Sequence, residues 1–159
     1  MKNLLYILVS VLTISACSSV DCPLNNRVYS KSGFYVHGDT AKSIADTLTV
    51  NLRVNGKDTI ILNKKTGAHD IQLPVSFLNN GDTLALVVNN TDGFSVTDSI
   101  YMEKTNELHF ESVECGPCYF HEIVSVRSTN NFIDSVVVKK KTLDYDLSAE
   151  HMYIYLKRQ

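Results

Sequence analysis

The most reactive side chains in this 159-residue chain are those of its four cysteines, Cys17, Cys22, Cys115 and Cys118. The last two are separated by Gly116 and Pro117, which is the spacing of a thiol–disulfide exchange pair. In such a pair, a thiolate on Cys115 attacks a substrate disulfide and Cys118 resolves the mixed disulfide. This chemistry needs a low pKa on the first cysteine, which a helix N-terminus usually supplies.

The residues around this cysteine pair do not supply that setting. The segment after Cys118 is rich in β-forming residues and lacks a helical stripe. Glu114 precedes Cys115, and a neighbouring carboxylate raises the pKa of a thiol. Thioredoxin-like proteins share the tetrapeptide, but they have an aromatic residue before it and a later cis-proline, and no proline follows Pro117 here. We therefore expect a protein that is not an enzyme, with thiol–disulfide exchange by Cys115 and Cys118 as the alternative.

A structural role for the cysteines is the main hypothesis. If Cys17 is lipidated, three thiols remain, and an oxidising compartment allows one disulfide and one odd cysteine. A bridge from Cys22 to Cys115 would close a long loop and contribute up to about 4 kcal/mol. We expect this pairing first and Cys22–Cys118 second, whereas a Cys115–Cys118 bridge restricts little. Gly116, at positive φ, and Pro117 would then fill the centre of a type II′ turn at a hairpin tip.

The first seventeen residues have the layout of a secretory signal. Lys2 precedes an apolar run from Leu4 to Ile14, which is too short for a membrane span of ~20 residues. The ending Ile-Ser-Ala-Cys resembles a bacterial lipobox. This resemblance implies that residues 1–16 are removed and that Cys17 carries acyl chains such as palmitate. Two or more acyl chains anchor a protein stably to a membrane.

The expected mature chain is one domain on a short tether. Removing 16 of 159 residues leaves 143, with the lipidated cysteine and tether at 17–26 and a single domain at 27–159. The removed segment contains only Lys2 as a charge, so 14 Lys and Arg face 17 Asp and Glu. This acidic balance argues against nucleic acid as a partner, because no basic field is present to displace counterions.

Alternating apolar residues predict an all-β fold. In residues 47–54, for example, Leu48, Val50, Leu52 and Val54 fall on one face, and Asn55-Gly56 then signals a tight hairpin. Turn residues recur every 8–12 positions, which favours an antiparallel, immunoglobulin-like β-sandwich of nine or ten short strands. The expected strands lie at 28–36, 47–54, 59–62, 71–78, 83–88, 94–101, 108–113, 119–128, 133–138 and 152–156.

The remaining candidate sites are weaker. His109 and His121 flank the cysteine turn and, with Glu111 and Glu114, form a conceivable metal site, but zinc spacing would need a second close pair. We expect no metal, no cofactor and no catalytic residue. The tyrosines suit either a glycan- or protein-contact patch or simple packing on a sheet face. Those tyrosines are Tyr29, Tyr35, Tyr145, Tyr153 and Tyr155.

Besides the lipobox, six segments of the chain carry a shared pattern, at 21–22, 25–26, 46–50, 73–75, 110–116 and 129–134. With the lipobox, they resemble a family of small uncharacterised lipoproteins common in Bacteroidota. The resemblance implies an architecture and a location, and Cys118 is an extra cysteine relative to its pattern. Surface export in such bacteria follows acidic residues after the lipidated cysteine, and here only Asp21 lies there.

These features together predict a lipid-anchored, non-enzymatic binding or scaffolding module of the cell envelope. The protein would be held in the outer membrane by Cys17 and face the periplasm. Its partner would be an envelope protein or a glycan.

Overall fold

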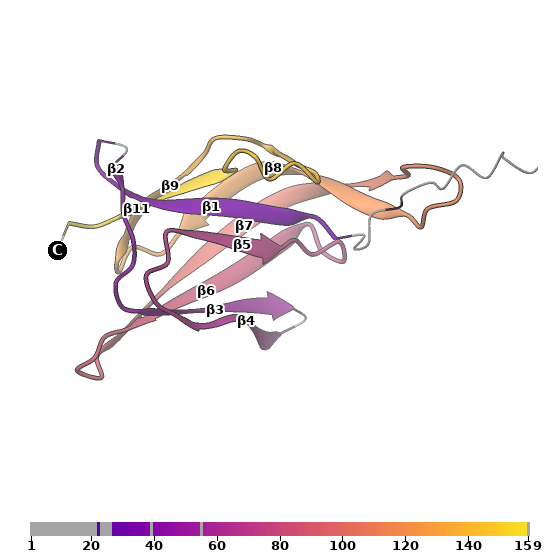
Figure 1. Cartoon of the computed structure of the whole chain (residues 1–159). Helices are drawn as coiled ribbons and strands as arrows, with labels where there is room; N and C mark the ends of the chain where they lie inside the picture. The colour runs from indigo at the N-terminus through magenta and orange to yellow at the C-terminus, as the bar shows by residue number, and fades with distance from the viewer. Residues whose placement is uncertain (1–21, 23–26, 39, 55, 159) are drawn as a thin grey trace, which may run out of the picture.

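The computed structural model describes residue 22 and residues 27–38, 40–54 and 56–158. In these residues, eleven strands form two sheets that pack as a β-sandwich (Figure 1), which confirms the predicted fold class. The two strands that have no counterpart among the expected ranges, at 40–41 and 142–143, are only two residues long. Across the described ranges, no helix has the length and hydropathy needed to cross a bilayer.

The five-stranded sheet is arranged around β1, which pairs in parallel with β11. The other edge of β1 pairs antiparallel with β2 at one end and with β5 at the other, while β9 borders β11. Its strands are β1 (Tyr29–Val36), β2 (Thr40–Ala41), β5 (Asp70–Pro74), β9 (Ile133–Val138) and β11 (Met152–Leu156).

The six-stranded sheet has the order β10-β8-β7-β6-β3-β4, and all its pairs are antiparallel. The predicted Asn-Gly hairpin joins β3 to β4, where Val54 pairs with Lys57 and Gly56 has a φ of 77°. Asn55 itself lies outside the described residues. The strands are β3 (Thr47–Val54), β4 (Lys57–Lys65), β6 (Gly81–Asn89), β7 (Ser95–His109), β8 (Cys118–Ser128) and β10 (Thr142–Leu143).

The core lies between the two sheets and consists of the inward-facing residues of each alternating strand. Phe34 and Ile154 are paired in register and almost fully buried, and they pack in one cluster with Leu48, Leu86 and Ile100 of the opposite sheet. Each such side chain contributes roughly 1.5–3 kcal/mol through burial. A smaller cluster at the other end of the sandwich is formed by Val28, Val75, Met102, Ile123, Leu143 and Met152.

Strand β7 corrects one sequence prediction. Two strands were expected at 94–101 and 108–113, but a single strand of 15 residues runs from Ser95 to His109. The alternation continues inward through Ile100, Met102 and Lys104, all of them buried. Because a buried lysine breaks the apolar pattern, the middle of the strand was not recognised.

The long β7 creates a projecting arm. The last residue pair between β6 and β7 is Gly81 with Glu103, so beyond that point β7 pairs only with β8. We call residues 107–120 the hairpin arm, and Figure 1 shows it extending to the right past the other strands. This arm carries the cysteine tetrapeptide.

Candidate functional site

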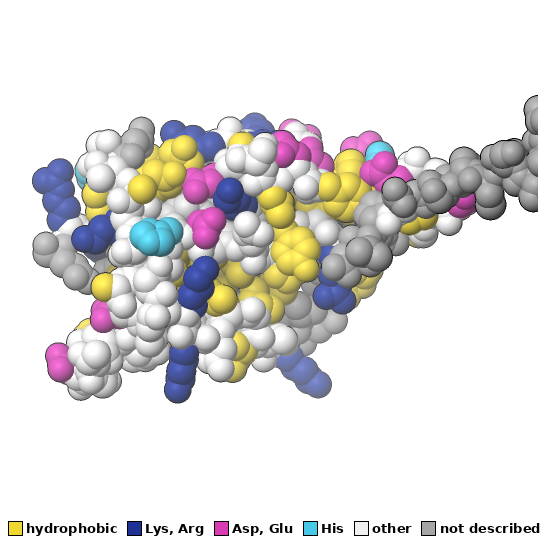
Figure 2. Space-filling view, in the orientation of Figure 1, with side chains coloured by type: hydrophobic (Ala, Val, Ile, Leu, Met, Phe, Trp, Pro, Cys, Tyr) yellow, Lys and Arg dark blue, Asp and Glu magenta, His cyan; other side chains and the backbone are white. Residues whose placement is uncertain are grey.

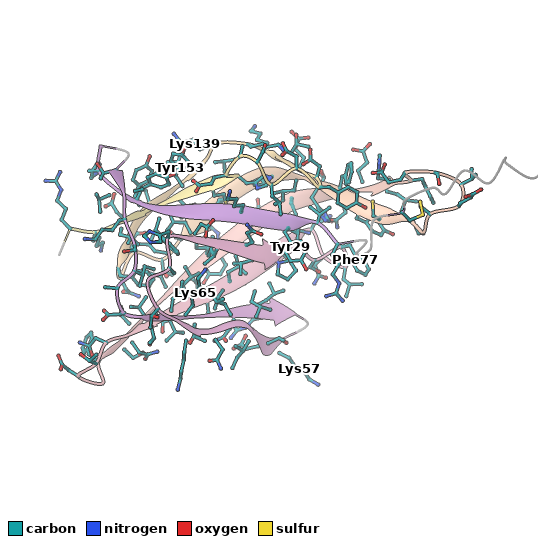
Figure 3. All side chains as sticks on the ribbon, viewed as in Figure 1. Tyr29, Lys57, Lys65, Phe77, Lys139 and Tyr153 are labelled. Carbon is teal, nitrogen blue, oxygen red and sulfur yellow. A yellow bond between two sulfur atoms is a disulfide. The ribbon has the colours of Figure 1, made fainter. Side chains whose placement is uncertain are left out.

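A disulfide joins Cys22 to Cys115, with a sulfur–sulfur distance of 2.11 Å and a Cα–Cα distance of 5.5 Å. Cys115 lies in the connection between β7 and β8, so the bridge ties residue 22 to the hairpin arm. Cys118 opens β8 as a buried free thiol, and its Sγ donates to the carbonyl oxygen of His109 at 3.6 Å. Figure 3 shows sulfur atoms along the arm. Because Cys115 is bonded to Cys22 and Cys118 is free, the two cysteines of the tetrapeptide are not bonded to each other.

The predicted type II′ turn at Gly116 and Pro117 is wrong. The β7–β8 connection spans residues 110–117, and Gly116 does not adopt a positive φ. The chain instead turns at Ser112, whose carbonyl accepts from the Cys115 N–H at 3.3 Å and whose Oγ accepts from the Glu114 N–H at 3.2 Å. This wider loop places Cys115 outside the ladder, where it can reach Cys22.

The two histidines near the arm have separate surroundings. His109 stacks on Phe120 with 4.1 Å between ring centroids, and its Nε2 lies 3.2 Å from Glu111 Oε1. His121 is buried, and its Nδ1 lies 2.7 Å from Asn106 Oδ1. In the part of the chain that the structure describes, no cluster of three or more His, Cys, Asp or Glu is arranged to hold a metal ion.

A buried ammonium group holds the loop between β5 and β6 against β7. The Lys104 side chain is fully buried, and its Nζ donates to the Ser76 and Asn79 carbonyls at 2.5 and 2.6 Å and to Asn106 Oδ1 at 2.9 Å. These three acceptors satisfy its three N–H donors. Asp82 Oδ2 lies 3.8 Å away; burial lowers the pKa of Lys104 and raises the pKa of Asp82. These contacts give Lys104 a structural role, which is to attach the loop between β5 and β6 to β7.

The buried His121 makes stability depend on pH. Burial, followed by the nearby charge of Lys104, lowers its pKa to about 4, against 6.5 for an ordinary histidine. The unfolded chain therefore binds a proton more readily, so the stabilisation by neutral His121 is complete above pH 6.5 and is lost as pH falls toward 4. Between pH 7.5 and 5 we expect His121 to account for a loss of roughly 2 kcal/mol of unfolding free energy.

Urea unfolding of wild type and His121→Gln at several pH values measures this effect. Asp82, whose raised pKa acts in the opposite direction, is present in both proteins, so the difference between their pH slopes isolates His121. We expect a flatter profile for the variant. Identical slopes would show that His121 is not held neutral by the fold.

A second buried polar group, Asp98, fixes the loop between β8 and β9. Its carboxylate is fully buried and accepts the Thr129 hydroxyl at 2.7 Å and the backbone N–H groups of Asn131, Phe132 and Ile133 at 2.8, 2.7 and 2.7 Å. This buried role of Asp98 could not be predicted from the sequence, because an aspartate between β-formers resembles a turn or surface residue. Its role is to order the entry into β9.

The tyrosines gather on the outer face of the five-stranded sheet. Along β1 and β11, Phe34 and Ile154 are paired and point inward to the core. Successive side chains of a strand alternate between faces, so the side chains of Tyr35, Tyr153 and Tyr155 point outward. The rings of Tyr35 and Tyr153 stack with centroids 4.0 Å apart, and the Tyr155 ring is 6.1 Å from that of Tyr35. We call Tyr35, Tyr153 and Tyr155 the tyrosine face.

Charged side chains border the tyrosine face. Lys139 Nζ lies 4.5 Å from the centroid of Tyr153, and Figure 3 shows these two labelled side chains next to each other. The Tyr35 hydroxyl donates to Glu150 Oε2 at 2.7 Å, which raises the pKa of Tyr35. A side chain at Gly33 would meet the Glu150 carboxylate, since a Cβ there would lie 2.4 Å from it. The glycine thus leaves room for the acid.

Two predicted tyrosines lie elsewhere. Tyr145 packs edge-on against Phe120 at 5.2 Å, and Tyr29 lies at the opposite end of β1, paired with Pro74. Beside the tyrosine face is a shallow depression of about 340 Å³. It is lined by His37, Gly38, Ser135, Val137 and Tyr155.

Comparison with known proteins defines the family of the chain. No curated protein and no solved structure matches it. The sequence model of a family of unknown function matches residues 47–156, which extend from β3 through β11. The predicted membership of an uncharacterised family is thereby confirmed in its general form. Because the match covers more than half of the 159 residues, the chain belongs to the family of unknown function DUF6452.

Proposed function

We propose that this protein is a lipid-anchored module of the cell envelope that binds a protein partner without catalysing a reaction. The observation that supports binding is the tyrosine face, which joins three aromatic side chains from two strands at opposite ends of the described chain. Tyrosine is enriched in protein interfaces, because it offers a large apolar ring and a polar hydroxyl. The lipid anchor is inferred from the lipobox-like ending at Cys17.

The ring arrangement favours a protein over a glycan as the ligand. Aromatic rings that bind ligands by stacking must leave a ring face free. Tyr153 has the ring of Tyr35 on one side, from β1, and the ammonium group of Lys139 on the other, just beyond β9. Its ring is therefore presented edge-on. An edge-on aromatic cluster with Lys139 and Glu150 at its border suits the apolar centre and polar rim of a protein interface.

The anchor would also define where the module acts. Cys17 precedes Cys22 by five residues, and Cys22 is bonded to the hairpin arm. A fully extended chain of five residues spans at most ~18 Å. We propose that the module lies close to the outer membrane, on its periplasmic side, with the tyrosine face available to a neighbouring envelope protein.

Photo-crosslinking in intact cells tests the binding proposal. A photoreactive amino acid at Val137, which lines the depression beside Tyr155, should yield a discrete adduct of higher mass. The control position is Ile60 on β4 of the other sheet, an exposed apolar residue on a strand. We expect an adduct at Val137 that is lost in Tyr153→Ser, and none at Ile60. Equal adducts at both positions, or none at Val137, would contradict the proposed face.

A further inference from the structure

We propose that the tip of the hairpin arm contacts the lipid surface beside the anchor. The tip exposes three apolar side chains, Leu108, Phe110 and Val113, of which Val113 is fully exposed. They surround the end of the arm, where β7 and β8 pair only with each other. Figure 2 shows hydrophobic side chains where this arm leaves the main body.

The disulfide gives the arm its position relative to the membrane, so this inference rests on the proposed lipid anchor. Cys115 lies two residues after Val113 and is bonded to Cys22. A chain of five residues from Cys22 to an acylated Cys17 reaches at most ~18 Å. An acylated Cys17 would therefore hold the tip close to the bilayer. Among the described residues, no disulfide links the opposite end of the sandwich to residue 22.

Because the lipid anchor already holds the protein at the membrane, a weak contact between the tip and the bilayer is enough to keep the tip there. Three exposed side chains would hold a free protein on a membrane only briefly, but linkage to the bilayer converts their insertion into an intramolecular step. Apolar and aromatic side chains settle at the boundary between headgroups and acyl chains. Phe110 and Val113 have the chemistry and the exposure for that boundary.

The charge of the arm indicates which lipid headgroups the tip can contact. Glu107, Glu111 and Glu114 are exposed or nearly so, and His109 is the one basic group among residues 107–120. Acidic groups are repelled by the negative potential of anionic lipids. The tip is thus suited to a zwitterionic surface, such as one of phosphatidylethanolamine and phosphatidylcholine.

The absence of tryptophan from the sequence allows a direct experiment. Phe110→Trp places a single tryptophan at the tip, where the native phenylalanine is 56% exposed. The matched control is Phe94→Trp at the opposite end of β7, where the native phenylalanine is 70% exposed. Each acylated mature protein is incorporated into zwitterionic vesicles with brominated acyl chains, which quench tryptophan within the bilayer.

We expect the Phe110→Trp emission to shift to shorter wavelength and to fall about two-fold on brominated vesicles, as for an interfacial tryptophan. Emission from Phe94→Trp should stay unchanged, and vesicles with anionic lipid should reduce the quenching at position 110. Equal emission on brominated and ordinary lipid for Phe110→Trp would overturn the contact.

The two proposals fail in distinguishable ways. Protein that floats with the vesicles but shows no quenching at position 110 retains the anchor and overturns the tip contact. Protein whose N-terminal peptide carries no acyl group overturns the anchor, and with it the placement of the tip. A Phe110→Trp variant with the wild-type melting temperature confirms that the fold is unchanged.

Discussion

Asp98→Ala is expected to lower the unfolding free energy by about 4 kcal/mol, because it removes a buried acceptor that serves several donors. Three backbone N–H groups, of Asn131, Phe132 and Ile133, would lose their partner, and both Asp98 and Ile133 are fully buried. Each unsatisfied buried donor costs about 1–3 kcal/mol, and relaxation of the loop recovers part of the sum. Thermal and urea unfolding of the purified domain measure the change.

A matched control separates this effect from loss of an aspartate in general. Asp92 is exposed in the turn before β7, and Asp92→Ala should change the unfolding free energy by no more than about 0.5 kcal/mol. Asp98→Asn keeps the shape and one carbonyl oxygen, so it should fall between the two. A loss below 1 kcal/mol for Asp98→Ala would show that Asp98 does not order the loop between β8 and β9.

Removal of the Cys22–Cys115 bridge is the second large effect. In Cys22→Ser/Cys115→Ser, we expect the unfolding free energy to drop by about 4 kcal/mol, because a loop with a sequence separation of 93 residues is no longer closed in the unfolded chain. The double variant also prevents Cys115 from pairing with Cys118. Urea unfolding without reductant compares it with wild type.

A thiol count identifies the bridge independently. Acylated wild-type protein, unfolded without reductant, should expose one alkylatable thiol, and peptide mapping should place it at Cys118. An alkylated Cys22 would show that the bridge uses another pair. An unfolding free energy equal to wild type in the double variant would show that the bridge does not stabilise the fold.

The sandwich could be predicted because its signals are local. Alternation along 47–54 and the Asn-Gly pair at its end are visible within a dozen residues, and both correspond to β3 and its hairpin. The uninterrupted β7 was not predictable in the same way. Lys104 faces inward because loop carbonyls of Ser76 and Asn79 solvate it, and those acceptors come from a distant segment.

The tyrosine face depends on contacts that no local pattern contains. Tyr35 and Tyr153 meet because β1 and β11, from opposite ends of the described chain, pair in parallel. A tyrosine patch was one of two alternatives for the five tyrosines, and no local pattern separates Tyr35, Tyr153 and Tyr155 from Tyr29 and Tyr145. Likewise, the tetrapeptide suggested a tight turn, whereas hydrogen bonds to Ser112 make the wider loop.

Lipid attachment at Cys17 is the claim on which the proposed function and the tip contact both depend. Mass spectrometry of the N-terminal peptide, from protein purified out of its native membrane, tests it directly. We predict a peptide that begins at Cys17 and carries fatty-acyl groups. A peptide that begins at Met1, with an unmodified cysteine at position 17, would contradict the proposal.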